Sequence, residues 1–249
     1  MKIIRLCFFI FPFFIFPFLI SCSSAESDAA LDNQSQSLQR LVDLEYDMAA
    51  RNSANPYDDV GQVHNELMLT YYYAESQPLT FSGRVSVLTT IANSNSSFYH
   101  LNKNATYVLS TTHENRLLDI ISEQDSCLTP IIDSSVVGQA ARDSLEDFVH
   151  DFLDLCEVEE DYSVIHDFVV AYEDAVLKET SWTPQDKKVV LITSSVARHS
   201  AYARKKKPKK NKDPDWEYMV GNIIATIGGA GEGEAEAVMM GLVAGVVEN

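Results

Sequence analysis

The sequence predicts an all-α protein, a multi-helix bundle with a glycine-rich C-terminal helix or helical hairpin. Three observations predict this class. Apolar residues recur at helical spacing in several segments, Asn-Pro and Thr-Pro pairs stand where those segments begin, and small residues occupy every fourth position of the tail. The one β-branched run, residues 84–91, has no hairpin turn at either end. A hydrophobic content of 46% is typical of a globular chain and excludes wholesale disorder.

The helices are expected in chain order from local signals. They are expected at residues 38–50, from Asn55-Pro56 onward, at 113–123, from Thr129-Pro130 onward, at 161–179 and from Thr183-Pro184 onward, with a loop at 93–97. Asn and Thr can cap a helix, and Pro fits its first turn. Asp186, three residues after Thr183, makes this start nearly a capping box. Gly138 is a candidate break in the helix that begins at Pro130.

The tail has the most regular pattern in the chain. Its small residues recur every fourth position, at Gly221, Ala225, Gly229, Gly233, Ala237, Gly241 and Gly245. On a helix they form a stripe along which a second backbone can approach closely. The preferred interpretation is close helix packing inside the folded body; the alternative is a glycine zipper that inserts in a membrane or self-associates. Glu232, Glu234 and Glu236 divide the tail into halves too short to span a bilayer.

The first 21 residues have the pattern of a secretory signal peptide. Lys2 and Arg5 precede an apolar run, residues 6–20, and small residues follow it. Pro12, Pro17 and a length of about 15 residues argue against a membrane-spanning helix, which needs about 20. Residues 1–21 are therefore predicted to be a signal, residues 22–39 a flexible tether of Ser, Ala, Asp, Asn and Gln, and residues 40–249 a single all-α domain.

The end of the signal, Leu19-Ile20-Ser21-Cys22, resembles the lipobox of bacterial lipoproteins. That resemblance implies export through the inner membrane, a diacylglycerol thioether on Cys22, cleavage before it and anchoring in the cell envelope, at the outer membrane. An ordinary cleaved signal in which Cys22 is incidental is the alternative.

The chain is acidic, which restricts its partners. Its formal charge is −17, and loss of Lys2 and Arg5 with the signal makes it −19. Such a charge opposes binding to nucleic acid and to bare anionic membrane. The expected partners are therefore the membrane, through lipid at Cys22, and an unknown envelope partner. One lysine-rich run, residues 204–212, breaks the pattern; it is interpreted as a solvated loop or as a contact to lipopolysaccharide phosphates or an acidic partner.

Several histidines are candidates for a catalytic or metal-binding role. His64 and Asn65 follow Gly61, which would let another helix come close, and they are interpreted as a polar core pair in preference to a catalytic pair. Asp147-x-x-His150 resembles half of a di-iron motif, but the nearest second half, Ser163-x-x-His166, lacks its acid. No catalytic residue, metal site or cofactor is therefore predicted.

Two cysteines of the body, Cys127 and Cys156, could pair in an oxidising envelope. If residues 129–155 form one helix, its length of about 40 Å keeps its ends too far apart for a disulfide. We expect both thiols to be free.

Three short motifs in the body resemble those of uncharacterised lipoproteins and secreted proteins of Gram-negative bacteria. They are Gly61-x-x-His64-Asn65, Ser195-x-x-Arg198-His199-Ser200 and the glycine-rich tail. The resemblance implies a helical fold and no reaction. The sequence thus favours a lipid-anchored envelope protein with a structural or binding role. The alternatives are an envelope hydrolase using His64 or His150, and a membrane-active or self-assembling protein using the tail.

Overall fold

The computed structural model describes residues 49–74, 77–206 and 215–247, which belong to one compact unit, residues 44–249. The signal, Cys22, the tether, most of the helix expected at 38–50 and most of the lysine-rich run lie outside the described residues. All of the regular secondary structure in the described part of the chain is helical, which confirms the predicted all-α fold class.

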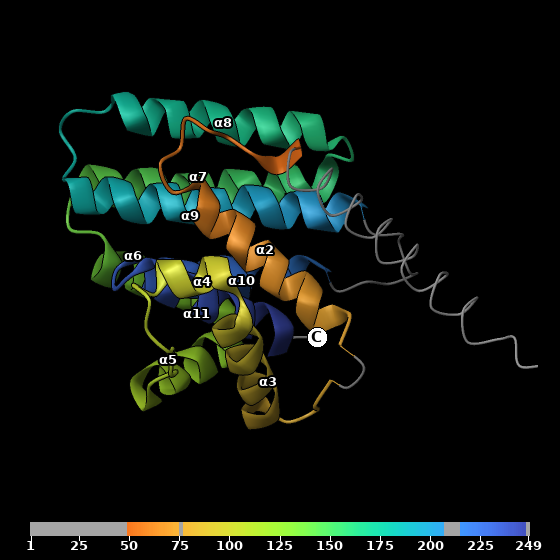
Figure 1. Ribbon diagram of the computed structural model, residues 1–249. Coiled ribbons are helices and arrows are strands. Elements are labelled where there is room, and N and C mark those ends of the chain that lie inside the picture. The colour runs from red at the N-terminus through yellow and green to blue at the C-terminus, as the bar shows by residue number, and fades with distance from the viewer. Residues whose placement is uncertain (1–48, 75–76, 207–214, 248–249) are drawn as a thin grey trace, which may run out of the picture. The chain divides into compact units, whose positions relative to one another are not determined.

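The helices follow one another with short connections (Figure 1). They are α2 (Asp58–Tyr72), α3 (Phe81–Ser94), α4 (Ser96–Leu101), α5 (Thr111–Ser122), α6 (Gln124–Ser135), α7 (Gln139–Val158), α8 (Tyr162–Lys178), α9 (Pro184–Lys206), α10 (Asp215–Ala230) and α11 (Glu234–Val247).

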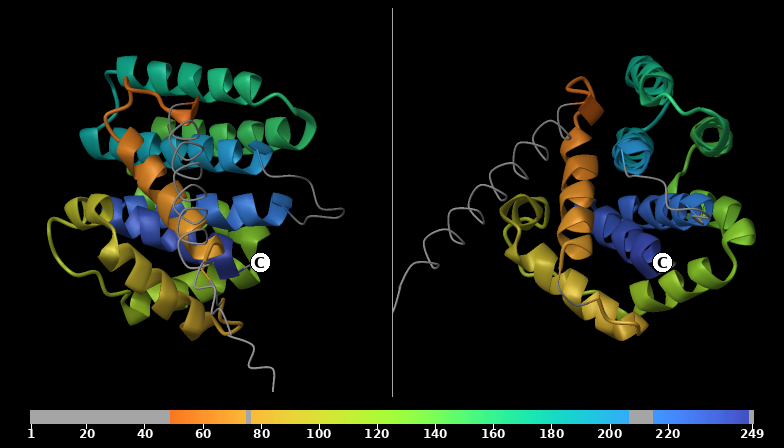
Figure 2. Two further views of the ribbon diagram at one scale, coloured as in Figure 1. Left: turned by 45° about the vertical axis from the view of Figure 1, so that its right-hand side comes forward. Right: turned by 90° about the vertical axis from the view of Figure 1, so that its right-hand side faces the viewer.

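The glycine-rich tail is a helical hairpin at the centre of this unit. Helices α10 and α11 pack against each other; α10 also packs on α9 and α6, and α11 on α2 and α3. Figure 2 shows the hairpin surrounded by these helices. Helix α11 is buried on nearly every side, from Ala235 to Val246. A helix that is apolar all round is stable in water only where other elements cover it.

Helices α7, α8 and α9 form a second layer (Figure 1). Phe148 of α7 stacks on Tyr172 of α8 with ring centroids 4.2 Å apart, and Phe168 and Phe152 extend the stack. Helix α2 crosses from this layer to the hairpin, because it packs on both α9 and α11. Together with α9, which packs on α10, it joins the two parts.

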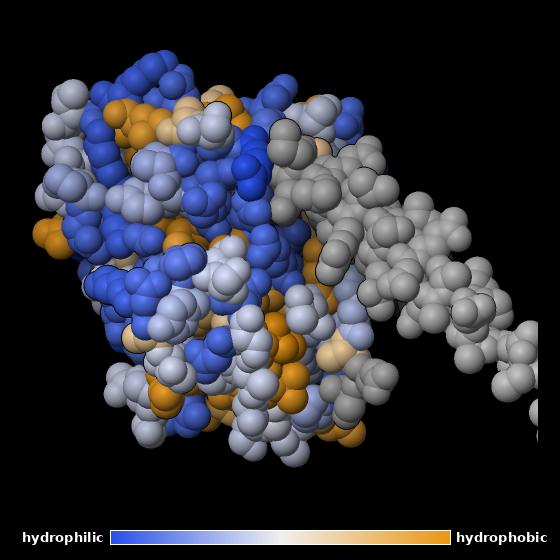
Figure 3. All heavy atoms as spheres, viewed as in Figure 1, coloured by the Kyte–Doolittle hydropathy of each residue, from blue (hydrophilic) through white to orange (hydrophobic). Residues whose placement is uncertain are grey.

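The exterior differs between the two halves. On the face drawn in Figure 3, hydrophilic side chains dominate the half formed by α7, α8 and α9, while apolar side chains are more frequent over the half that carries α3 to α5. Leu79 and Val108, which flank α3 and α4, are among the most exposed apolar residues described. No helix of the described ranges is both long enough and apolar enough to cross a membrane.

Several helix boundaries differ from the sequence-based expectation. Helix α2 begins at Asp58, later than Asn55-Pro56, because the Asn55 side chain accepts a hydrogen bond from the Tyr57 N–H (2.9 Å) and forms a turn before the helix. The loop expected at 93–97 is a single residue, Asn95, which caps α4 by accepting from the Phe98 N–H (2.8 Å). Residues 84–91 are part of α3.

The helix expected from Thr129-Pro130 onward is two helices. Helix α6 begins at Gln124, with Pro130 inside it, and Gly138 precedes α7 as its N-cap residue. A proline costs a helix one backbone hydrogen bond, and burial of Ile131 and Ile132 next to it offsets that loss. The break expected at Gly138 is therefore confirmed, and residues 129–155 do not form one helix. Cys127 and Cys156 are free thiols, as expected.

Candidate functional site

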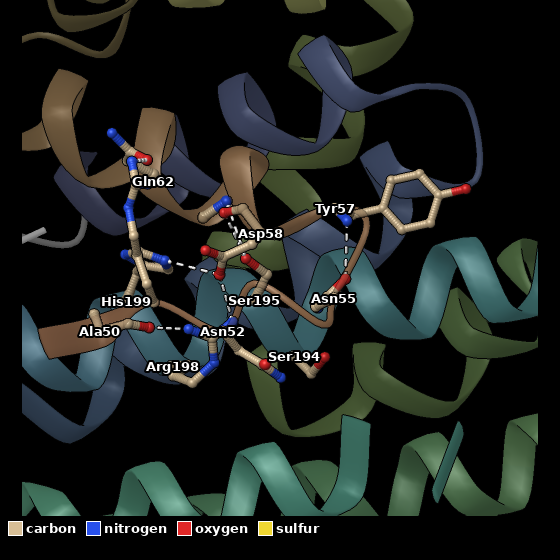
Figure 4. A network of polar contacts seen from close by, with 12 residues as sticks. Ala50, Asn52, Asn55, Tyr57, Asp58, Gln62, Ser194, Ser195, Arg198 and His199 are labelled. Carbon is tan, nitrogen blue, oxygen red and sulfur yellow. Dashed lines mark hydrogen bonds and ion pairs between the residues drawn. The ribbon is translucent and has the colours of Figure 1, made fainter. Parts of the chain in front are cut away.

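A buried ion cluster lies where the start of α2 meets α8 and α9 (Figure 4). Arg198 of α9 is fully buried, and its Nη2 contacts Asp58 Oδ1 at 2.6 Å and Glu173 Oε1 at 3.2 Å. Its Nη1 donates to the Ala50 carbonyl oxygen. The guanidinium, which α9 carries, thus binds α2, α8 and the segment before α2.

Neutral donors complete the shell of Glu173. The Nδ2 atoms of Asn52 and Asn55 donate to its carboxylate at 2.6 and 2.7 Å, and Ser194 Oγ donates at 3.0 Å. Asn55 also donates to the Leu191 carbonyl oxygen at 2.9 Å. A buried carboxylate is tolerated only when it is paired and hydrogen-bonded in this way.

Gly61 allows α2 and α9 to approach closely enough for the cluster to form. A Cβ at this position would lie 2.5 Å from the Ser195 carbonyl oxygen and 2.7 Å from His199 Cδ2. The Gly61 N–H donates to Ser195 Oγ (3.2 Å), and that hydroxyl donates to the Asp58 carbonyl oxygen (3.0 Å). Any side chain larger than hydrogen at Gly61 would separate the two helices.

The electrostatics of the cluster favour its charged carboxylate–guanidinium form. Burial alone would lower the pKa of Arg198, but the charges of Glu173 and Asp58 outweigh burial and raise it. Burial would likewise raise the pKa of Asp58, yet its contacts with His199 and Arg198 hold it below the usual range. Burial lowers the pKa of His199, whose Nε2 lies 3.3 Å from Asp58 Oδ1. At neutral pH the Asp58 carboxylate therefore faces the Arg198 guanidinium and a neutral His199 imidazole.

His64 and Asn65 lie one turn further along α2. Both side chains are buried, and neither ring nitrogen of His64 nor Oδ1 of Asn65 has a hydrogen-bond partner among the described residues. The nearest polar neighbour of His64 is Asn222 of α10, whose Nδ2 donates to Ser200 Oγ at 3.2 Å. The structure thus places the predicted pair in the core, with His64 beside Asn222 of α10.

The other histidine motif is not assembled into a site. Asp147 and His150 are exposed on α7. His166 of α8 is directed to the Arg51 carbonyl oxygen, 3.3 Å from its Nε2. Within residues 49–74, 77–206 and 215–247, no three His, Cys, Asp or Glu side chains are grouped to hold a metal ion.

The cluster also lacks the geometry of nucleophilic catalysis. Ser195 and His199 both contact Asp58, one through its carbonyl oxygen and the other through its carboxylate. No hydrogen bond joins the serine hydroxyl to the imidazole in the described part, so the base is not placed to activate a nucleophile. What the arrangement does physically is fix the entry of α2 against α8 and α9.

The small residues of the tail lie between the two helices of the hairpin. A Cβ at Gly229 would lie 2.4 Å from the Glu236 carbonyl oxygen, and one at Gly241 would lie 2.3 Å from Thr226 Oγ1. Ala225 and Ala237 are fully buried. Glu232, in the turn of the hairpin, forms ion pairs with His113 and Arg116 of α5, each at 2.7 Å.

Asp186 forms a second, smaller polar site at the start of α9. Its carboxylate accepts hydrogen bonds from the Val137 N–H (2.7 Å) and the Gly138 N–H (3.3 Å), and its own N–H donates to Thr183 Oγ1 (3.0 Å). Although burial would raise its pKa, these hydrogen bonds lower it below the ordinary 3.8. The residue therefore joins the α6–α7 connection to α9.

We expect Asp186→Ala to lower the free energy of unfolding by about 1–2 kcal/mol, because it leaves backbone N–H groups without an acceptor. Asp143→Ala on the exposed face of α7 is the control and should change little. Because the pKa of Asp186 is lowered on folding, its contribution is present above pH 3.8 and lost as the pH falls through the lowered value. Urea titrations at several pH values measure this; an Asp186→Ala deficit that persists undiminished at the lowest pH would contradict the assignment.

Comparison of the chain with protein-family models, with characterised proteins and with solved structures finds no match.

Proposed function

We propose that the chain is a lipid-anchored protein of the bacterial cell envelope whose helical body has a structural or binding role. The observation that carries the proposal is Leu19-Ile20-Ser21-Cys22 after a signal-like apolar run. Acylation at Cys22 and at the new amino terminus would supply two or more acyl chains, and stable membrane attachment needs at least two such signals. The chain without its signal, at −19, would not adhere to anionic lipid by charge.

The arrangement of the body supports a structural or binding role over hydrolysis. The polar groups that come together there, Arg198, Asp58 and Glu173, satisfy one another inside the core. Of the two histidines that a hydrolase would use, His64 is fully buried and His150 is exposed on α7. A substrate could reach His64 only if α2 moved.

The self-assembly alternative has less support. The small residues that would form a zipper between chains, such as Gly229 and Gly241, are occupied by contacts within the hairpin. An intermolecular zipper would require those contacts to open.

Cys22→Ala tests the anchoring. Cells that express the full chain are grown with an azide-bearing fatty acid, and the protein is isolated and coupled to a fluorophore. We expect label on the wild type and on Cys127→Ala, a control that removes a different free thiol. Cys22→Ala should carry no label and should accumulate as the longer precursor. Equal labelling of Cys22→Ala, or no labelling of the wild type, would refute the lipid anchor.

A further inference from the structure

His64 occupies an unusual position for an ionisable side chain. It is fully buried, and both of its ring nitrogens lack a hydrogen-bond partner among the described residues. Buried polar groups are nearly always hydrogen-bonded, so this imidazole gains little from its surroundings even when neutral. It lies on the helix that joins the α7–α9 layer to the hairpin, one turn after the close contact between Gly61 and α9.

The charged groups around His64 offer it no counter-ion. The ionisable side chain whose charge acts on it directly is His199 of α9, which repels a second positive charge. The buried carboxylates at the start of α2 and on α8, Asp58 and Glu173, are already paired with Arg198.

No acidic side chain of the remaining neighbouring helices acts on the pKa of His64. Helix α10 contributes the neutral Asn222, and α11 has no ionisable side chain from residue 237 to 247. Arg84 of α3 binds the carbonyl oxygens at the end of α11, and His100 of α4 is exposed. A proton on His64 would therefore be a buried charge without compensation, which is strongly unfavourable.

We propose that His64 makes α2 an acid-sensitive latch: protonation of this imidazole separates α2 from α9, α10 and α11 and exposes the faces that α2 covers. Opening places His64 in water, where its charge is solvated. Because α2 packs on both α9 and α11, its release uncovers part of the glycine-rich hairpin without requiring the hairpin itself to unfold. This inference depends on the geometry of the body and not on the lipid anchor.

The expected pH range follows from the shift of His64. Burial, with a smaller effect of His199, lowers the pKa of His64 from 6.5 to about 4, and the Asn222 side chain offsets only part of this shift. A basic group with a lowered pKa is neutral in the closed state and binds a proton in the open state. The closed state of α2 therefore has its full stability above pH 6.5, and this stability falls as the pH drops toward 4. Between pH 7.5 and 4.5 this linkage increases the open fraction of α2 by roughly 70-fold.

Hydrogen–deuterium exchange of the purified full chain tests the latch, with rates corrected for the intrinsic effect of pH. Peptides from α2 in the wild type should show the roughly 70-fold increase in opening between pH 7.5 and 4.5, while those from α10 and α11 away from α2 remain protected. His64→Gln cannot take up the proton and should lose this factor. His150→Gln, which removes an exposed histidine of α7, should behave like the wild type.

His64→Met, which is apolar and similar in size, is the second variant in case His64→Gln does not fold. Circular dichroism at each pH establishes that the proteins compared are folded. The latch is refuted if α2 opens equally with acid in the wild type and in the folded His64 variant. It is also refuted if the wild type shows no acid response, or if all helices lose protection together.

Discussion

Replacing Arg198 by Met is expected to lower the free energy of unfolding by about 3–5 kcal/mol, the cost of removing one partner from a buried ion pair. Methionine fills much of the same volume, so the loss is mainly electrostatic. Asp58 and Glu173 would remain inside the core without the guanidinium that compensates both. Against a typical total of about 5–15 kcal/mol, this change can unfold the protein. Urea denaturation at neutral pH, followed by circular dichroism, measures it.

The matched control is Arg142→Met, which breaks the partly exposed ion pair with Asp133 on the surface. Exposed pairs contribute about 0–1 kcal/mol, so this variant should remain close to the wild type. Adding Glu173→Gln to Arg198→Met removes one uncompensated charge and should recover part of the loss, because the two sites are coupled. If Arg198→Met is as stable as Arg142→Met, the cluster does not hold α2, α8 and α9 together.

The fold class could be predicted because amphipathic spacing survives in the surrounding helices. In α7 and α8 the apolar positions, such as Phe148 and Phe152, repeat at helical intervals and are the ones buried. The hairpin was visible from its small residues, and the Asp161 cap predicted the start of α8 to within a residue.

Helix boundaries were harder to predict because local sequence preferences and tertiary packing compete there. Pro130 is a strong local signal for a helix start, but burial of Ile131 and Ile132 offsets one lost hydrogen bond and the helix extends before it. Asn95 looked like part of a loop, whereas its side chain caps α4 directly after α3 ends. Neither outcome can be decided from propensity alone.

Only part of the candidate site could be predicted from the sequence. His64 and Gly61 were recognised as core residues from their spacing, since a glycine within a helical pattern indicates close approach. The ion cluster was not, because Asp, Glu and Arg are exposed in most proteins and its members come from three separate helices. One signal was present: apart from His199, Arg198 stands in a stretch of α9 made of apolar or small residues, from Val189 to Ala203. A charge in such a stretch requires a buried partner.

The hairpin gives the second large effect. Gly229→Ala should destabilise the protein by about 3 kcal/mol, the upper part of the range for overpacking. The added methyl group would lie 2.4 Å from the Glu236 carbonyl oxygen and 2.6 Å from the Ala237 nitrogen. These are backbone atoms in the first turn of α11, so no change of rotamer can relieve the contact, and the two helices must move apart.

The adjacent glycine is the matched control. At Gly228 the nearest atoms to an added Cβ are 3.6 Å away, on the side chains of Arg116 and Ile131. Neither glycine has a positive φ, so Gly228→Ala should be neutral or should stabilise α10, by up to about 1 kcal/mol from helix propensity. Thermal unfolding and light scattering of the two variants separate buried packing from self-association. If the tail were an intermolecular zipper, Gly229→Ala would melt as the wild type does and would instead lose an oligomer. A lowered melting temperature in a protein of unchanged mass requires that the contact be made within one chain.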